Sequence, residues 1–299
     1  MQQIKNIINK LLFVVLLRGS SVPIEEQASF PKAEKDELEN NLRNLLLEDN
    51  CDGEQIYRDC YENLHQFVLK HAQSQQDHVY SANMKRYVPI CKLIGSGKRV
   101  IEIGCGEGIL SMAIAKVGNY VIGTDVSESI INLAEKAREK ENITNVSFKL
   151  IAGSRKLPFS SNTYDCVISK SVFEHFRPKD VYIHLNEVKR LLKAGSGCYF
   201  LIVPHKRFGY AKGLHLKLYT YRELNKILSE TGFSVLRCPI FPLIFQFNFL
   251  VPISYKISLE KRLHRLRIPE LLWLLLGLEP IMIIARKPSI EYSKDEINI

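Results

Sequence analysis

Arg99 to Gly108 read RVIEIGCGEG, and this stretch decides the fold. Its first half, Arg99 to Ile103, is a short apolar run of the kind that forms a buried strand. Three glycines follow at alternate positions, namely Gly104, Gly106 and Gly108. Residues without a Cβ permit a sharp turn and let a ligand approach the backbone. The stretch therefore predicts a strand that ends in a ligand-binding turn and leads into a helix.

Short apolar runs alternate with amphipathic stretches along the rest of the chain. The pattern predicts strands at 99–103, 120–124, 146–151, 164–169, 199–203, 233–237 and 281–285. It predicts helices at 109–117, around 130–137 and at 181–192, and another that opens at the capping box of Thr220 and Glu223. Such alternation predicts an α/β fold with a doubly wound, Rossmann-like, mainly parallel sheet covered by helices on both faces.

The glycine spacing and the residue before it indicate the ligand. The spacing G-x-G-x-G differs from the dinucleotide fingerprint G-x-G-x-x-G, and no Lys-Ser or Lys-Thr follows as in a P-loop. Glu102 stands two residues before the first glycine. A carboxylate there would repel a phosphate but attract a cationic ligand that carries a sulfonium and an ammonium group. S-adenosylmethionine (SAM) is such a ligand.

Asp125 follows the second predicted strand. An acidic side chain at that place can accept hydrogen bonds from ribose hydroxyls, as in other doubly wound nucleoside sites. The glycine turn, Glu102 and Asp125 together favour a SAM site. The alternative is a tight turn beside an Asp that only caps a helix.

The segment from Val100 to Leu110 resembles the first motif of class I SAM-dependent methyltransferases. The likeness continues at Leu157-Pro158-Phe159, Tyr164-Asp165, Val172-Phe173-Glu174-His175 and Val188-Lys189-Arg190-Leu191-Leu192-Lys193. These motifs resemble the small-molecule and lipid branch that includes the ubiquinone-pathway methyltransferases. The resemblance implies a seven-stranded sheet with an antiparallel last strand, and SAM as the methyl donor. The predicted cofactor-binding residues are Glu102, Gly104, Cys105, Gly106, Gly108, Asp125, Val126, Gly153, Ser154 and Ser169.

The chain departs from this family before Leu157. Many members carry an acidic residue there, which meets the adenine amino group. This sequence has Gly153-Ser154-Arg155 instead. Backbone amides or Ser154 are then expected to hold the adenine.

Three histidines are candidates for a catalytic base. His175 follows the fourth predicted strand, and His205 and His215 follow the fifth. Methyl transfer needs a base only when the acceptor starts protonated, as a hydroxyl does. Each histidine has packing as its alternative role. No C-x-x-C pair occurs, so no metal site is expected from the sequence.

The chain divides into three predicted regions. Residues 1–87 form a helical, acidic N-terminal extension, residues 88–287 the methyltransferase domain with an apolar and basic insertion at 239–280, and residues 288–299 a tail. The apolar run from Leu11 to Leu17 is too short to span a bilayer and is expected to be part of a peripheral helix. The insertion suits a membrane surface or a hydrophobic acceptor, or else builds a cap over the site.

Charge and cysteine content bear on location and partners. The seven cysteines predict free thiols in a reducing compartment, which favours the cytoplasm. The insertion and the apolar N-terminal run add the expectation of peripheral membrane contact. The expected acceptor is a small molecule, a lipid, a quinone precursor or a glycan-pathway intermediate. The alternatives are a nucleic-acid or protein methyltransferase, or a non-catalytic partner protein with the same fold. The net charge of +9 permits a nucleic-acid partner, but no RNA-binding module or Asn/Asp-Pro-Pro-Tyr/Phe motif supports one.

Overall fold

The computed structural model describes residues 32–47, 53–71, 84, 87–204, 214–237 and 281–289. The apolar N-terminal run, His205, the 239–280 insertion and residues 290–299 lie outside the described residues. The peripheral helix and the membrane-facing insertion therefore stay predictions. Within the described ranges, no helix combines the length and the apolar character needed to cross a bilayer.

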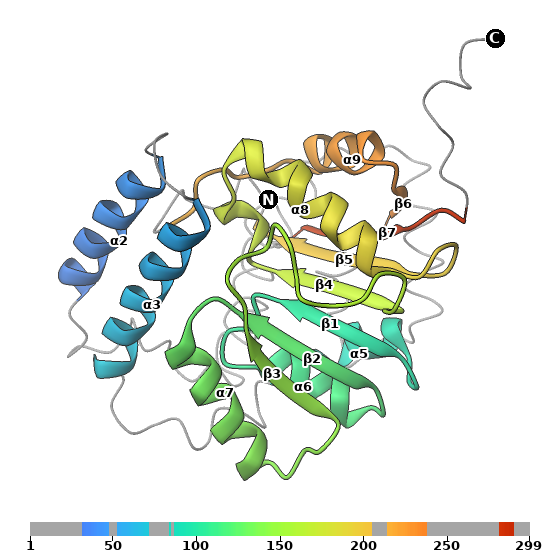
Figure 1. The fold of residues 1–299 in the computed structure, drawn as a ribbon, viewed down its shortest axis with the longest axis horizontal. Coiled ribbons are helices and arrows are strands. Elements are labelled where there is room, and N and C mark those ends of the chain that lie inside the picture. Colours follow the sequence, from blue (N-terminus) through green and yellow to red (C-terminus); the bar gives the residue numbers. More distant parts are fainter. Residues whose placement is uncertain are drawn as a thin grey trace, which may run out of the picture.

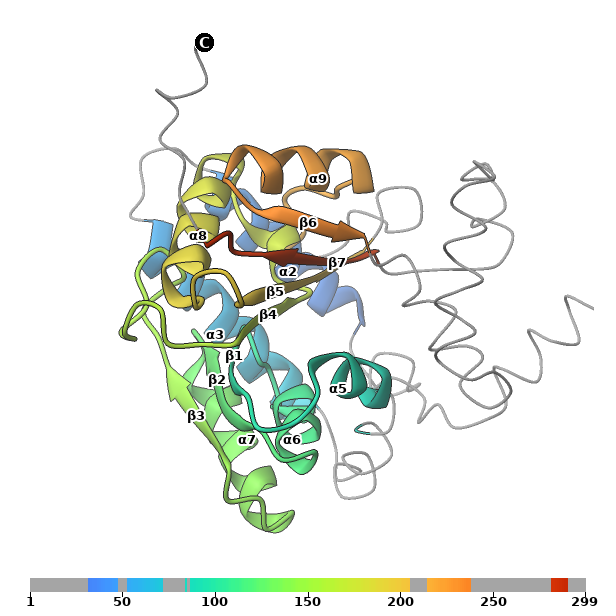
Figure 2. The same cartoon turned by 90° about the vertical axis from the view of Figure 1, so that its right-hand side faces the viewer.

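The core is a seven-stranded sheet in the order β3-β2-β1-β4-β5-β7-β6 (Figures 1 and 2). The strands are β1 Arg99–Ile103, β2 Tyr120–Asp125, β3 Val146–Leu150, β4 Cys166–Lys170, β5 Cys198–Val203, β6 Ser234–Arg237 and β7 Ile281–Arg286. Strand β7 pairs antiparallel with both β5 and β6, and the pairs among β1 to β5 are parallel. The predicted α/β fold with an antiparallel last strand is confirmed.

Helices cover both faces of the sheet because successive strand residues point to opposite sides. Val100 packs with α5 Val88–Ile94, α6 Ile109–Lys116 and α7 Glu128–Lys140. Its neighbour Ile101 packs in a second cluster with α8 Pro178–Leu191 and α9 Tyr221–Glu230. Figure 2 shows α9 and α6 on either side of the sheet. A short 3₁₀ helix, η4 Phe173–His175, follows β4.

Two predicted boundaries differ from the structure by more than one residue. Tyr164 was expected to begin the fourth strand, but β4 begins at Cys166. Tyr164 instead forms an isolated bridge with Leu192, because its N–H and C=O bond to the backbone at the end of α8. Helix α8 begins earlier than the apolar pattern indicated, since Pro178 in its first turn needs no N–H partner.

The N-terminal extension contributes two helices that lie side by side, α2 Lys32–Leu47 and α3 Gly53–His71 (Figure 1). Leu42, Leu46 and Cys60 form a small core between them together with Leu214. Helix α3 is also anchored to α7, because the Glu62 carboxylate accepts from Ser127 Oγ at 2.7 Å and from Ser129 N at 3.2 Å. The boundary at residue 87 stays a prediction, but α3 is packed against the sheet domain.

The predicted capping box at the start of α9 is present. Thr220 Oγ1 accepts from Glu223 N at 3.2 Å, and Glu223 Oε2 accepts from Thr220 N at 2.7 Å. Both bonds satisfy amides that the first turn of a helix leaves without partners.

Replacing Thr220 by Ala removes one half of this box. Thr220→Ala should lower the free energy of unfolding by about 1 kcal/mol, the usual cost of losing an N-cap side chain. Urea unfolding followed by circular dichroism measures it. The control is Thr144→Ala, at an exposed loop position, which should shift stability by less than about 0.5 kcal/mol. Equal effects of the two substitutions would show that the box contributes nothing.

Candidate functional site

A cavity of about 580 Å³ lies at the carboxyl ends of β1 to β4, within the usual size of a ligand pocket. Open α/β sheets bind their ligands at this edge. Its lining comes from the turn after β1, the end of β2 and the segments after β3 and β4. Helix α3 supplies a further wall.

The glycine turn after β1 is tied to the end of β2. Gly104 N and Cys105 N both donate to the carbonyl of Thr124 at 2.8 Å. Gly106 N donates to Asp125 Oδ2 at 3.0 Å. The turn residues Gly104, Gly106 and Gly108 all have positive φ, which side chains disfavour.

The three glycines serve different purposes. A Cβ on Gly104 would lie 2.3 Å from Val172 Cγ2, and one on Gly108 would lie 2.3 Å from Phe148 Cζ. These two glycines allow close packing. A Cβ on Gly106 would meet no atom within 4 Å, and Gly106 lines the cavity. Gly106 is therefore the glycine whose bare backbone is left for a ligand.

Asp125 organises the turn and still has capacity for a ligand. Its side chain lines the cavity, and its Oδ1 accepts from Ser127 N at 3.1 Å while Oδ2 accepts from Gly106 N. Each carboxylate oxygen has two lone pairs, so each can accept a further hydrogen bond. The predicted interaction with two ribose hydroxyls is compatible with this geometry.

Glu102 lines the cavity and is 2% exposed. Ser111 Oγ on α6 donates to its Oε2 at 2.6 Å. Burial raises the pKa of Glu102 to about 7, against the lowering effect of the Ser111 hydrogen bond. A cationic ligand nearby would favour the ionised carboxylate, as the sequence argument requires.

The structure brings most of the predicted site residues to this cavity. Its lining includes Glu102, Gly104, Cys105, Gly106, Asp125, Val126, Gly153, Ser154 and His175. Gly108, Ser169 and His215 are outside that lining, and His205 lies outside the described residues. Ser169 is fully buried within β4, where the sequence had suggested a cofactor contact.

The wall formed by α3 was not predicted as part of the site. Glu54, Tyr57, Tyr61, Leu64 and His65 line the cavity from this helix. Tyr57 donates from its hydroxyl to the carbonyl of His175 at 2.8 Å and accepts from Arg177 N at 2.9 Å. The sequence signal is helical spacing, since Tyr61, Leu64 and His65 stand at i+4, i+7 and i+8 from Tyr57, but such spacing describes any helix that covers a core.

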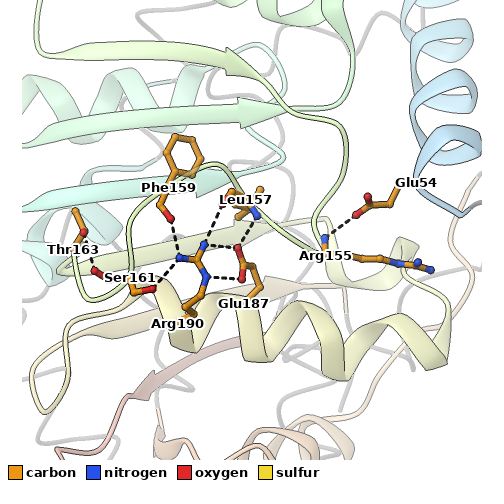
Figure 3. A network of polar contacts seen from close by, with 8 residues as sticks. All are labelled: Glu54, Arg155, Leu157, Phe159, Ser161, Thr163, Glu187 and Arg190. Carbon is orange, nitrogen blue, oxygen red and sulfur yellow. Dashed lines mark hydrogen bonds and ion pairs between the residues drawn. The ribbon is translucent and has the colours of Figure 1, made fainter.

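Glu54 lies against Gly153 and Arg155, in the stretch where the family that the sequence resembles was expected to carry an acidic residue. Arg155 N donates to Glu54 Oε1 at 3.0 Å (Figure 3). A Cβ on Gly153 would lie 2.6 Å from Glu54 Cδ and from Oε1. The carboxylate from α3 therefore stands where a side chain at position 153 would begin.

The Leu157-Pro158-Phe159 motif is held on α8 by one ion pair (Figure 3). Glu187 Oε1 accepts from Leu157 N and from Arg190 Nη2, both at 2.6 Å. Arg190 also donates to the carbonyls of Leu157 and Phe159 at 3.1 and 2.8 Å. These bonds fix the loop that leads away from Gly153 and thereby keep that side of the cavity in place.

His175 and His215 lie together, with ring centroids 4.8 Å apart. Burial, and then the proximity of His215, lower the pKa of His175 to about 4. A general base works best when its pKa lies near the operating pH. His175 is therefore a poor match for accepting a proton at neutral pH, although it lines the cavity.

The contrast between Gly106 and Gly108 can be measured. Gly108→Ala should lower the free energy of unfolding by about 2 to 4 kcal/mol, because it combines a positive φ with overpacking against Phe148. Gly106→Ala meets no atom, so it should cost only about 1 to 2 kcal/mol of backbone strain. Urea unfolding of both variants tests this. Equal losses would contradict the packing role of Gly108.

Residues 100–195 match a family model described as a methyltransferase domain. The chain is 28% identical over 131 residues to a ubiquinone biosynthesis O-methyltransferase of Acinetobacter baylyi, and the match covers 44% of this chain and 54% of that relative. It is 36% identical over 93 residues to the mitochondrial ubiquinone biosynthesis O-methyltransferase of Schizosaccharomyces pombe, which covers 31% and 34% of the two chains. The chain thus spans about half, or less, of the length of these curated relatives.

Among solved structures, the fold is similar to a chain in the complex between the Haloferax volcanii Trm112 methyltransferase activator and a putative methyltransferase. The TM-score is 0.51 at 17% identity, and the match covers 71% of this chain and 95% of that chain. At this identity the likeness shows the fold alone.

Proposed function

We propose that this chain, whose residues 100–195 match a family model described as a methyltransferase domain, transfers a methyl group from SAM to a small-molecule or lipid acceptor. One observation carries the proposal. The glycine turn, Asp125 and Glu102 line the same cavity, where Gly106 is open and the two carboxylates could accept from a ribose and attract a cation.

Methyl transfer is a displacement at the sulfonium, so the protein contributes mainly by aligning donor and acceptor. The donor end of the cavity is the strand edge. The other wall is α3, where Tyr57, Tyr61 and His65 present aromatic side chains that suit a flat, partly apolar acceptor. The relatives named for ubiquinone biosynthesis O-methylation support a hydroxyl acceptor of quinone-precursor type.

We further propose that Glu54 takes over the contact with the adenine amino group. Its carboxylate lies against Gly153 at the position of the family acid and lines the cavity. A carboxylate oxygen accepts a hydrogen bond from an amino group in the same way whichever helix or loop carries it. This assignment makes α3 part of the SAM site and explains why Gly153 has no side chain.

The SAM site predicts distinct effects of two substitutions. Gly106→Arg should abolish SAM binding, because the side chain fills the open space over the turn, while costing the same backbone strain of about 1 to 2 kcal/mol as Gly106→Ala. Asp125→Ala should weaken SAM binding by about 1 to 3 kcal/mol, the scale of lost charge-assisted hydrogen bonds. Isothermal titration calorimetry with SAM measures both. Absence of SAM binding by the folded wild-type protein would favour the non-catalytic alternative.

The role of Glu54 is tested by comparing two ligands. Wild-type protein should bind S-adenosylhomocysteine more tightly than S-inosylhomocysteine, whose ring has a carbonyl in place of the amino group. Glu54→Gln should weaken binding of the adenosyl ligand about fivefold to tenfold, the value of roughly one hydrogen bond, and reduce the difference between the ligands.

The matched control is Asp59→Asn, an exposed position on the same helix that removes the same charge. It should leave the affinities for both ligands unchanged. If Glu54→Gln keeps the full preference for the adenosyl ligand, another group contacts the adenine and the assignment is wrong.

A further inference from the structure

Lys170 is a cation in the wall of the cavity that has no carboxylate partner among the described residues. It is the last residue of β4, is partly buried and lines the cavity. Within the described ranges it makes no ion pair and no hydrogen bond. Its Nζ lies 5.7 Å from the ring centroid of Tyr87, which also lines the cavity. An aromatic face attracts a cation, so the ring holds the ammonium group in place without neutralising it.

Glu102 is the neighbouring acid on the same face of the sheet. It is the register partner of Ile168, and Lys170 follows Ile168 by two residues, so both charged side chains point to the face covered by α5 and α6. Burial raises the pKa of Glu102 to about 7, against the lowering effects of the Ser111 hydrogen bond and of the Lys170 charge. The two charged groups are thus near enough to interact, but they do not form an ion pair with each other.

Arg155 is the other Lys or Arg side chain in the described lining, and its charge is met inside the protein. Its Nη2 donates to Asp180 Oδ1 at 2.7 Å, and both of these side chains line the cavity. Lys170 differs from Arg155 because the described residues give it no such partner. The positive charge of Lys170 is therefore left for a ligand in the cavity.

The charge of the proposed cofactor decides what that ligand group must be. SAM carries a sulfonium, and a lysine in its cavity repels it unless an anion neutralises the lysine. Lysine binds carboxylates and phosphates through short, charge-assisted hydrogen bonds. Glu102 and Asp125 in the same lining repel a doubly charged phosphate more strongly than a singly charged carboxylate. The surroundings of Lys170 therefore favour a carboxylate.

We propose that Lys170 binds a carboxylate of a ligand in this cavity. Two ligands can supply that group. One is SAM itself, whose amino-acid end carries a carboxylate and an ammonium group on one carbon, and these match the opposite charges of Lys170 and Glu102 on neighbouring strands. The other is an acceptor molecule with an acidic substituent. Either source makes Lys170 a specificity-determining residue, and the inference rests on the proposed function because it takes this cavity to be the SAM site.

Isothermal titration calorimetry of the full chain tests the cofactor as the source of the carboxylate. The two ligands are S-adenosylhomocysteine and S-adenosyl-3-thiopropylamine, which lacks only the carboxylate. Wild-type protein should bind S-adenosylhomocysteine at least about tenfold more tightly, the value of one hydrogen bond between charged groups. Lys170→Met should remove this preference, and Lys170→Arg, which keeps the charge, should retain most of it.

The acceptor is tested as the source with protein that is saturated with S-adenosylhomocysteine. The probes are 4-hydroxybenzoate and 4-hydroxybenzamide, two flat phenols of similar shape, of which only the first has a carboxylate. If the acceptor supplies the group, wild-type protein should prefer 4-hydroxybenzoate, and Lys170→Met should lose that preference. This outcome supports the proposal and assigns the carboxylate to the acceptor.

The matched control is Lys149→Met. Lys149 is an exposed residue of β3 whose Nζ lies 5.8 Å from the ring centroid of Phe159, so it is also a lysine over an aromatic ring. It is not part of the cavity lining. Lys149→Met should therefore bind all four ligands as wild type does.

A wild-type protein that prefers the carboxylate in neither pair of ligands would overturn the proposal. A preference that Lys170→Met keeps in full would overturn it as well. Lys170→Gln gives the same information if Lys170→Met does not fold. Unchanged discrimination with retained binding of S-adenosylhomocysteine contradicts this inference alone, whereas no binding by the folded wild-type protein contradicts the proposed function and this inference with it.

Discussion

The site depends on the hydrogen bonds that the carboxylate of Asp125 accepts. Asp125 ends β2 and holds the amides of Gly106 and Ser127, so it joins the glycine turn after β1 to the start of α7. Thr124 adds a carbonyl that accepts from Gly104 N and Cys105 N. These bonds hold the alternating positive-φ glycines of the turn in place before any ligand arrives, which removes part of the ordering cost of binding.

A second constraint comes from α3, because the segments at the strand ends line only part of the cavity and α3 lines the rest of it. Glu62 fixes this helix to the start of α7, Tyr57 fixes it to the segment after β4, and Glu54 fixes it to Arg155. The partners of these three side chains lie in the segments after β2, β3 and β4, and the same segments line the cavity of the proposed ligand. Loss of α3 packing would therefore open the acceptor side and disturb the adenine side at the same time.

The elements that follow local patterns were predicted well from the sequence. The strand before Gly104, the turn, Asp125 and the capping box at Thr220 are each specified within about five consecutive residues, and each is present. Features built from distant residues were missed. Glu54 meets Arg155 across 101 positions, and Tyr57 meets His175 across 118. The helical spacing in α3 predicts that one face of the helix is buried, but it does not predict which residues that face contacts.

Hydrogen–deuterium exchange of the full chain with and without saturating S-adenosylhomocysteine tests the central claim most directly, because it reports on the turn and on α3 in one experiment. The account predicts slower exchange on ligand binding in peptides that contain residues 104–108 and 125–127, and also in those of residues 54–65. Slower exchange elsewhere, with both the turn and α3 unchanged, would contradict it.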